Sequence, residues 1–203
     1  MIKNLIFDLG NVILKQKINF GGDYFASMVP SYPREEVYAF YRNNKRDLIS
    51  GNKSFREILE NFKSTFGIGT PTEDLYKKFK ESYIVDVEGV DAKVMKIVTG
   101  LNKKYSVYAM TNTIEPHFEY WETMGLDQNF KKIFRSDTDH FMKPDMTAYE
   151  YVLGKIGQPA KDCVFIDDLE KNVEGAKAVG IIGIVYANPA QLELDLAKIG
   201  VKI

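Results

Sequence analysis

Short apolar runs, each stopped by polar residues, recur along this chain and predict buried β-strands. A run of three to six apolar residues that ends at an acid, an amide or a turn is typical of a strand covered on both faces. The runs lie at residues 5–7, 106–110, 163–166 and 181–186, with a weaker candidate at residues 132–135.

Helical patterns separate these predicted strands. Residues 91–103, 149–156 and 170–179 each place their apolar side chains on one helical face, and Gly180 is positioned to end the last of them. Strands that alternate with helices indicate a parallel sheet with helices on both faces. The fold class predicted is therefore α/β, with a Rossmann-like parallel sheet.

Residues 19–87 break this alternation. They carry amphipathic helical patterns at residues 34–44, 55–66 and 72–83, joined by glycine-containing turns, and contain no convincing strand. We therefore expect a core domain formed by residues 1–18 and 88–203, and an all-helical insert at residues 19–87.

Composition narrows the range of functions. Of 203 residues, 27 are basic and 28 acidic, so no overall field favours nucleic acid or an anionic membrane surface. The single cysteine, Cys163, rules out an intramolecular disulfide. The apolar segment at the N-terminus is too short for a signal peptide, and no run reaches the length of a membrane span. These features predict a cytoplasmic protein without a nucleic-acid or membrane partner.

Polar side chains with useful chemistry stand where the predicted strands end. The carboxyl ends of parallel strands share one edge of the sheet, and ligands bind there. Taken singly, each such residue is more often a turn or cap residue, but their joint position predicts one cleft. Its members are Asp8, Thr111, Asn112, Asp167 and Asp168, with Lys143 from a nearby loop.

Three carboxylates in one cleft repel each other unless a cation intervenes. Magnesium suits such an oxygen-rich site, because it commonly takes one or two carboxylates, waters and a substrate phosphate. A lysine and a hydroxyl opposite the metal would cradle a phosphoryl group. Asp8 is then placed to attack phosphorus and form an aspartyl-phosphate.

Four segments, in order, resemble the motifs of the haloacid dehalogenase superfamily. They are residues 6–12, 110–113, 142–145 and 165–176. The resemblance extends over the whole chain, because the insert corresponds to the family's helical cap between the first and second motifs, as in its C1-capped subfamily I. It implies hydrolysis of a small phosphorylated metabolite with Mg²⁺.

The resemblance also assigns roles to residues. Asp8 would be the nucleophile and a magnesium ligand, beside the backbone carbonyl of Gly10 and the carboxylate of Asp168, with Asp167 in the outer shell. Lys143 would orient Asp8. The phosphate would be bound by Leu9, Gly10, Thr111, Asn112 and Lys143. In the cap, Arg46, Asn52 and Lys53 are candidates for contact with the leaving group, although charges at exposed helix ends are an equally good interpretation.

Gly10 departs from the family pattern, which has a second aspartate there as general acid and base. The surrounding segment is similar to a group of the α-glucose-1-phosphatase type, which suggests a sugar phosphate, in particular a sugar 1-phosphate, because an anomeric hydroxyl leaves with less help from an acid. Two rivals remain. A 2-haloacid dehalogenase also lacks this aspartate, but it places neutral residues where Asp167 and Asp168 stand. A catalytically impaired binding or regulatory protein is the other alternative.

Overall fold

A parallel sheet forms the centre of the fold. The computed structural model describes residues 1–17 and 21–203, and within them the sheet has five strands in the order β5-β4-β1-β6-β7. The strands are β1 (Asn4–Phe7), β4 (Ser106–Thr111), β5 (Ile133–Arg135), β6 (Cys163–Asp167) and β7 (Ile182–Val185). All five coincide with apolar runs in the sequence, so the predicted α/β parallel fold is confirmed.

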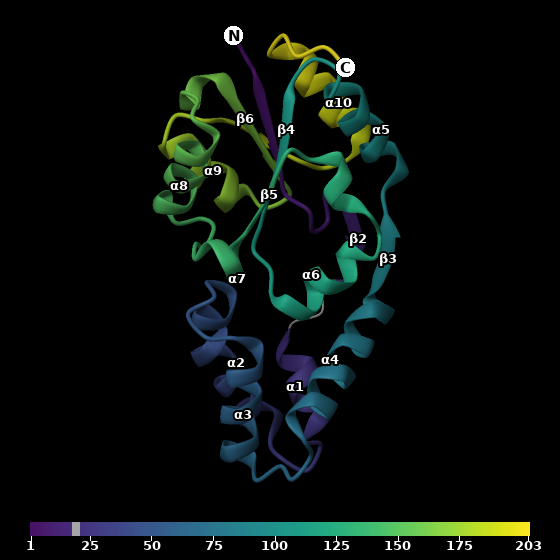
Figure 1. Cartoon of the computed structure of the whole chain (residues 1–203), viewed down its shortest axis with the longest axis vertical. Helices are drawn as coiled ribbons and strands as arrows, with labels where there is room; N and C mark the ends of the chain where they lie inside the picture. The colour runs from purple at the N-terminus through teal and green to yellow at the C-terminus, as the bar shows by residue number, and fades with distance from the viewer. Residues whose placement is uncertain (18–20) are drawn as a thin grey trace.

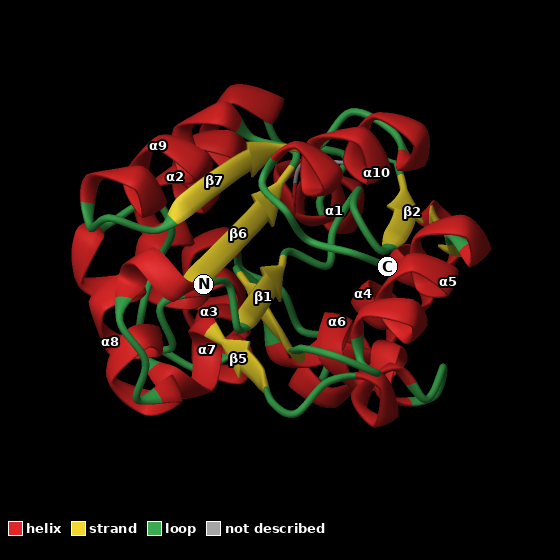
Figure 2. Cartoon of the chain, turned by 90° about the horizontal axis from the view of Figure 1, so that it is seen from above, coloured by secondary structure: helices red, strands yellow, loops and turns green. Residues whose placement is uncertain are grey.

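Helices cover both faces of this sheet (Figure 2). One side carries α5 (Ala92–Leu101), α6 (Glu115–Glu122) and α10 (Pro189–Lys198), and the other carries α8 (Met146–Ile156) and α9 (Glu170–Ala178). In β1, Leu5 and Phe7 pack with the first set of helices and Ile6 packs with the second. Because alternate residues of a strand point to opposite faces, helices on both sides of the sheet require apolar residues on both faces of β1, at Leu5, Ile6 and Phe7.

Four further helices pack together at one end of the molecule and are called the helical unit (Figure 1). They are α1 (Gly21–Met28), α2 (Arg34–Ile49), α3 (Phe55–Phe66) and α4 (Thr72–Asp86). A separate cluster rich in phenylalanine holds them together. Local signals fix α3, which begins at a capping box between Ser54 and Glu57 and ends at Gly67 in the left-handed region.

A short antiparallel pair joins the helical unit to the sheet. It is formed by β2 (Leu14–Gln16) and β3 (Val87–Val90). The expectation that the insert contains no strand is therefore wrong at its last residue, because β3 begins at Val87. This strand is short, half-exposed and interrupted by Gly89 at φ 122°, so it lacks the alternation that marks a strand. The expected start of the insert, at residues 18 and 19, lies outside the described residues.

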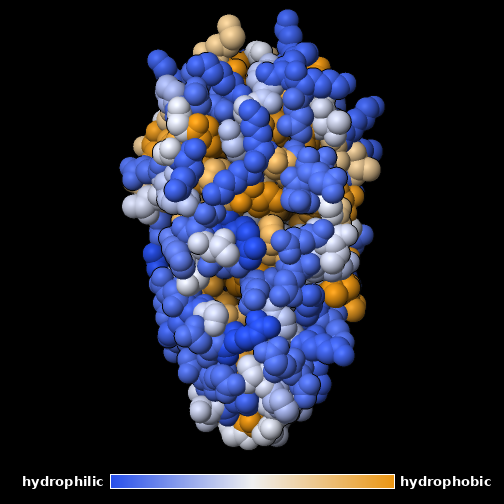
Figure 3. Space-filling model, viewed as in Figure 1, coloured by the Kyte–Doolittle hydropathy of each residue, from blue (hydrophilic) through white to orange (hydrophobic). Residues whose placement is uncertain are grey.

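The remaining elements are short or were not anticipated. The helix expected at residues 34–44 continues to Ile49 as α2, while α1, α6 and α10 have no counterpart among the sequence expectations. The others are α7 (Ser136–Asp139), η1 (Leu126–Asn129) and η2 (Ala160–Asp162). The face in Figure 3 is mostly hydrophilic, with apolar atoms visible chiefly in recesses. In residues 1–17 and 21–203, no helix has the length and hydropathy required to cross a membrane.

Candidate active site

The polar residues that follow the strands meet at one edge of the sheet, as the sequence predicts. Asp8 comes directly after β1, while Thr111 and Asp167 are the last residues of β4 and β6. Since β1 lies between β4 and β6, these ends are neighbours, and the Asp8 backbone N–H donates to the Ile166 carbonyl at 2.8 Å. The order of the strands thus positions the site.

Lys143 forms ion pairs with two of the carboxylates. Its Nζ lies 2.7 Å from Asp8 Oδ1 and 2.7 Å from Asp167 Oδ2, and it donates to the Met110 carbonyl at 2.9 Å. The lysine side chain is only 1% exposed. Its loop is held by Asn112, which accepts from the Lys143 N–H at 2.9 Å and donates to the Lys143 carbonyl at 2.9 Å. Of the partners predicted for Asp8, Lys143 is therefore in direct contact with it.

The carboxylates of this site carry more negative charge than Lys143 can balance. Burial raises the pKa of Asp8 to about 7, Lys143 opposes this shift, and the charges of Asp167 and Asp168 add to it. The pKa of Asp168 is raised as well, by burial and by the charge of Asp167. Three carboxylates facing one ammonium group form an environment that a divalent cation would stabilise.

The geometry of these carboxylates fits magnesium. Asp8, Asp167 and Asp168 each offer an oxygen within 4.8 Å of the others, and an all-oxygen donor set is what Mg²⁺ prefers. Asp167 is fully buried, and its two oxygens already accept from Lys143 Nζ, the Leu169 N–H and Asn172 Nδ2 at 2.7–3.0 Å. Asp168 is only half-buried, so its carboxylate is the better placed to turn toward a metal.

Gln16 occupies the space beside Gly10. A Cβ atom built on Gly10 would lie 2.9 Å from Gln16 Nε2 and 3.8 Å from Asp8 Oδ2. The side chain of Gln16 thus fills the position that an aspartate at residue 10 would take. Its Oε1 accepts from the Tyr83 hydroxyl at 2.8 Å, and that hydroxyl accepts from Trp121 Nε1 at 2.7 Å. This chain of hydrogen bonds turns Nε2 of Gln16 toward Gly10.

Two of the other predicted phosphate-binding residues are buried. The side chain of Leu9 is 0% exposed and packs in the core, so only its backbone can face a ligand. Thr111 is 2% exposed at the end of β4.

The three residues expected to contact the leaving group, Arg46, Asn52 and Lys53, form hydrogen bonds or ion pairs with other residues of the protein. Arg46 pairs with Asp145 of the sheet domain at 2.6 Å, two residues beyond Lys143. Asn52 and Lys53 both contact Asp47 within the helical unit, at 3.4 and 3.0 Å. Asn52 and Lys53 also line a polar cleft of about 580 Å³ between the helical unit and the sheet, together with Glu115 and Arg135.

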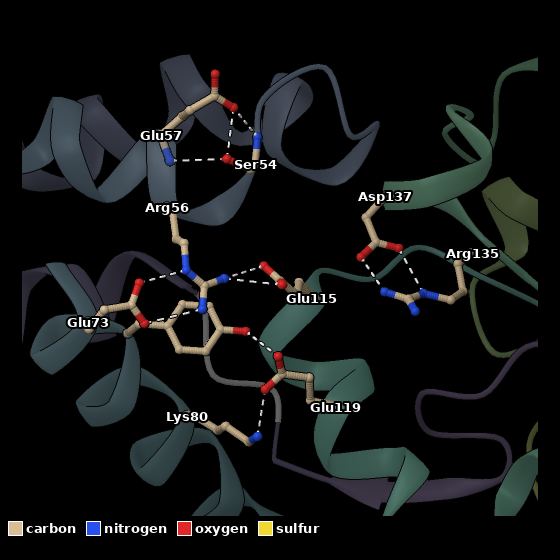
Figure 4. Close-up of polar contacts among 10 residues, drawn as sticks. Ser54, Arg56, Glu57, Glu73, Lys80, Glu115, Glu119, Arg135 and Asp137 are labelled. Carbon is tan, nitrogen blue, oxygen red and sulfur yellow. Dashed lines mark hydrogen bonds and ion pairs between the residues drawn. The ribbon is translucent and has the colours of Figure 1, made fainter.

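Polar contacts fasten the helical unit to α6 (Figure 4). Arg56 of α3 pairs with Glu115 at 3.0 Å. From α4, Lys80 pairs with Glu119 at 2.6 Å, and Tyr76 donates to the same carboxylate at 2.9 Å. These ion pairs are partly exposed and each contributes little to stability, but together they define how the two parts are oriented.

On the other side of the cleft, the loop after α2 lies against α7. The Ser50 carbonyl is 3.2 Å from His140 Nδ1, and a Cβ atom on Gly51 would fall 1.9 Å from the Asp137 carbonyl oxygen. Only glycine permits this approach. The helical unit therefore contacts the sheet domain at two separate places, α6 and α7.

Sequence reasoning missed two residues that support the site. Asn172 donates to both oxygens of Asp167 at 3.0 Å, and its position five residues after Asp167, on the first turn of α9, is a usable signal. Gln16 gave no such signal, because its place beside Gly10 depends on the chain folding back through β2.

Known proteins share the fold of this chain and part of its sequence. A family model for haloacid dehalogenase-like hydrolases matches residues 2–180. The chain belongs to this family, and by that membership it is a hydrolase.

The individual relatives have low sequence identity to this chain. A sesquiterpene phosphatase of Aspergillus oryzae is 32% identical over 134 residues, covering 65% of this chain and 67% of that protein. A D-ribitol-5-phosphate phosphatase of Bacteroides thetaiotaomicron is 22% identical and covers 98% of both chains. A drimenol cyclase of Aspergillus calidoustus is 24% identical over 98% of this chain, which spans only 37% of that longer protein.

Among solved structures, a haloacid dehalogenase family enzyme of Bacteroides thetaiotaomicron, in complex with magnesium and inorganic phosphate, superposes with a TM-score of 0.75. The match covers 92% of this chain and 95% of that one, at 20% identity. This likeness establishes a shared fold.

Proposed function

We propose that this chain is a magnesium-dependent phosphatase that hydrolyses a small phosphate monoester through an aspartyl-phosphate on Asp8. The observation that carries the proposal is the contact of Lys143 Nζ with both Asp8 and Asp167, at 2.7 Å each, at the carboxyl edge of the sheet. Relatives that are named as phosphatases support it, and so does the oxygen-rich cluster around Asp8.

Each residue has a distinct role in the first step. Lys143 holds Oδ1 of Asp8, which leaves Oδ2 to attack phosphorus while the bond from phosphorus to the ester oxygen breaks. Thr111, Asn112 and the backbone at Leu9 and Gly10 would bind the phosphate oxygens. Mg²⁺ held by Asp8, the Gly10 carbonyl and Asp168 would supply positive charge that offsets repulsion between the carboxylate and the phosphate.

In the second step, water attacks the aspartyl-phosphate, which restores Asp8 and releases inorganic phosphate. Gly10 has no side chain to protonate the departing alcohol, and Gln16 beside it does not ionise. The proposed substrate is therefore an ester with an acidic leaving group. A sugar phosphate, in particular a sugar 1-phosphate, belongs to this class and follows from the resemblance to the α-glucose-1-phosphatase group.

The helical unit is proposed to be the cap of a C1-capped enzyme, formed by residues 19–87 over a core of residues 1–18 and 88–203. Its contacts with the sheet domain leave a cleft of about 580 Å³ between the two parts, and a closer approach during turnover would exclude water from the reacting phosphate. Arg46, Asn52 and Lys53 are proposed for substrate contact. To reach a substrate, Arg46 would release Asp145, and Asn52 and Lys53 would release Asp47.

Phosphate release from a panel of esters tests the proposal. Hexose 1-phosphates, hexose 6-phosphates, nucleotides and a nitrophenyl ester would be assayed with and without Mg²⁺, beside Asp8→Asn. Magnesium-dependent release that is lost in Asp8→Asn is the expected result. If no ester is cleaved, the proposal fails, and halide release from 2-haloacids would then separate a dehalogenase from a non-catalytic protein.

A further inference from the structure

A small cavity lies between the helical unit and the sheet, on the Gln16 side of the proposed active site. Its volume is about 130 Å³. Gln16, Asn112 and Thr113 line the end near the active site. Because the amide of Gln16 also fills the space next to Gly10, close to Asp8 Oδ2, the cavity begins where the leaving group of a bound phosphate ester would lie.

Apolar and aromatic side chains form most of its walls. They come from α1, α2, α4 and the loop after β4, and include Phe25, Tyr41, Leu48, Ile49, Phe79 and Ile114. The ring of His117 also lines the cavity and stacks on Tyr83, with ring centroids 3.7 Å apart. Burial lowers the pKa of His117 to about 3, so this imidazole is uncharged at neutral pH.

Several polar groups in the walls are already paired within the protein, whereas Nε2 of His117 is buried without a hydrogen-bond partner among the described residues, and Lys17 adds a charged side chain. The Tyr83 hydroxyl is held by Gln16 and Trp121, and the Asn112 amide by the backbone of Lys143. The Tyr24 hydroxyl donates to Asp86. A sugar ring placed here would lose the hydration of several hydroxyl groups and find few partners, and each unpaired group weakens binding roughly ten-fold or more.

We propose that this cavity binds the leaving group of the phosphate ester and selects a single flat, apolar ring bearing a phenol-type oxygen. The inference rests on the phosphatase function proposed above and keeps its acidic leaving group, but it replaces the sugar phosphate with an aryl phosphate as the substrate class. At about 130 Å³ the cavity is slightly smaller than the roughly 150 Å³ of an apolar cavity that binds benzene, so it limits the leaving group to a single ring.

The chemistry of Gly10 favours the same class independently. When Asp8 Oδ2 attacks phosphorus, the electron pair of the breaking bond stays on the ester oxygen. A phenol has a pKa of about 10, so its anion departs without a proton from an acid. The Nε2 group of Gln16 supplies one hydrogen-bond donor near that oxygen, and water takes up the remaining charge.

The test compares esters and cavity variants with Mg²⁺ present. For the wild type, kcat/KM is measured on phenyl phosphate, glucose 1-phosphate and acetyl phosphate, whose leaving group is too small to fill the cavity. We expect phenyl phosphate to exceed glucose 1-phosphate by about 100-fold, the effect of two unpaired hydroxyl groups. Ile49→Phe, which fills the cavity, should lower the ratio of phenyl phosphate to acetyl phosphate turnover about ten-fold.

Ile68→Phe is the matched control. Ile68 packs on the same apolar cluster of the helical unit but does not line the cavity, so the ratio should stay at the wild-type value. Glucose 1-phosphate turned over as well as phenyl phosphate, or an unchanged ratio in Ile49→Phe, would overturn the cavity assignment and leave the phosphatase function standing. Absence of phosphate release from every substrate, the acyl phosphate acetyl phosphate included, would overturn both. The wild-type comparison decides even if Ile49→Phe does not fold.

Discussion

Gly51→Ala tests whether the contact between the helical unit and the sheet domain is required for turnover. A Cβ atom at this position would lie 1.9 Å from the Asp137 carbonyl oxygen. Real carbon–oxygen contacts are about 3 Å or longer, so the α2–α3 loop must retreat from α7 by roughly 1 Å. A misplacement of about 1 Å at a reacting centre can lower the rate about 100-fold, and we expect a loss of that size in kcat/KM.

Gly67→Ala provides the control for backbone strain. Both glycines have left-handed backbones, with φ of 69° at Gly51 and 61° at Gly67, but no atom lies within 4 Å of a Cβ built on Gly67. Each alanine adds about 1–2 kcal/mol of strain, which for a chain of this size lowers the melting temperature by roughly 2–8 °C. Only the methyl group added by Gly51→Ala would also clash with the Asp137 carbonyl oxygen.

The assay measures phosphate release and the melting temperature for both variants. The expected outcome is a lower melting temperature in both variants, with the larger drop in Gly51→Ala, and a large loss of activity in Gly51→Ala alone. If the two variants were equally active, closure of the helical unit on α7 would have no role in turnover, and the cap function proposed here would be refuted.

Two further predictions concern metal binding and pH. Mg²⁺ at about 100 times its Kd should add roughly 2.7 kcal/mol to stability and raise the melting temperature by about 5–10 °C; an equal rise in Asp168→Asn, measured by thermal denaturation, would contradict the ligand assignment. Asp91→Ala should lower the free energy of unfolding by about 1–2 kcal/mol at pH 7, because Asp91 caps α5 through the N–H groups of Lys93 and Val94. Burial acts to raise the pKa of Asp91, but Lys15 and these N–H groups outweigh it and hold the pKa below 3.8. This stabilisation is present above pH 3.8 and disappears as the pH falls through the lower folded-state pKa, so urea denaturation at pH 7 and pH 3 should show a difference between variant and wild type that shrinks in acid.

The sheet and the residues at its edge were predictable because they depend on local patterns and one general rule. The apolar runs before Asp8, Thr111 and Asp167 each mark a strand without reference to the rest of the fold. Parallel pairing then brings their carboxyl ends together. Lys143 was harder to place, since its loop is fixed by the Asn112 amide, but the motif around it identified the residue.

The contacts between distant segments could not be derived in this way. Nothing in the sequence near Gly51 shows that it will meet Asp137, because that approach depends on how two separately packed units are oriented. The pairing of Arg56 with Glu115 is of the same kind. Single charges on exposed helices have many possible partners, and the sequence offers no periodicity that selects one of them.

Gln16 shows how such a contact changes the chemistry of a site that the motifs describe only in part. By itself, Gly10 indicates a missing acid and leaves the space beside Asp8 open to water or to a second group. The structure fills that space with an amide whose orientation is fixed through Tyr83 and Trp121. An amide donates a hydrogen bond but transfers no proton at neutral pH, so the rate should depend strongly on the acidity of the leaving group. Selection among esters would then arise from the same residue that fills the space beside Gly10 and lines the apolar cavity.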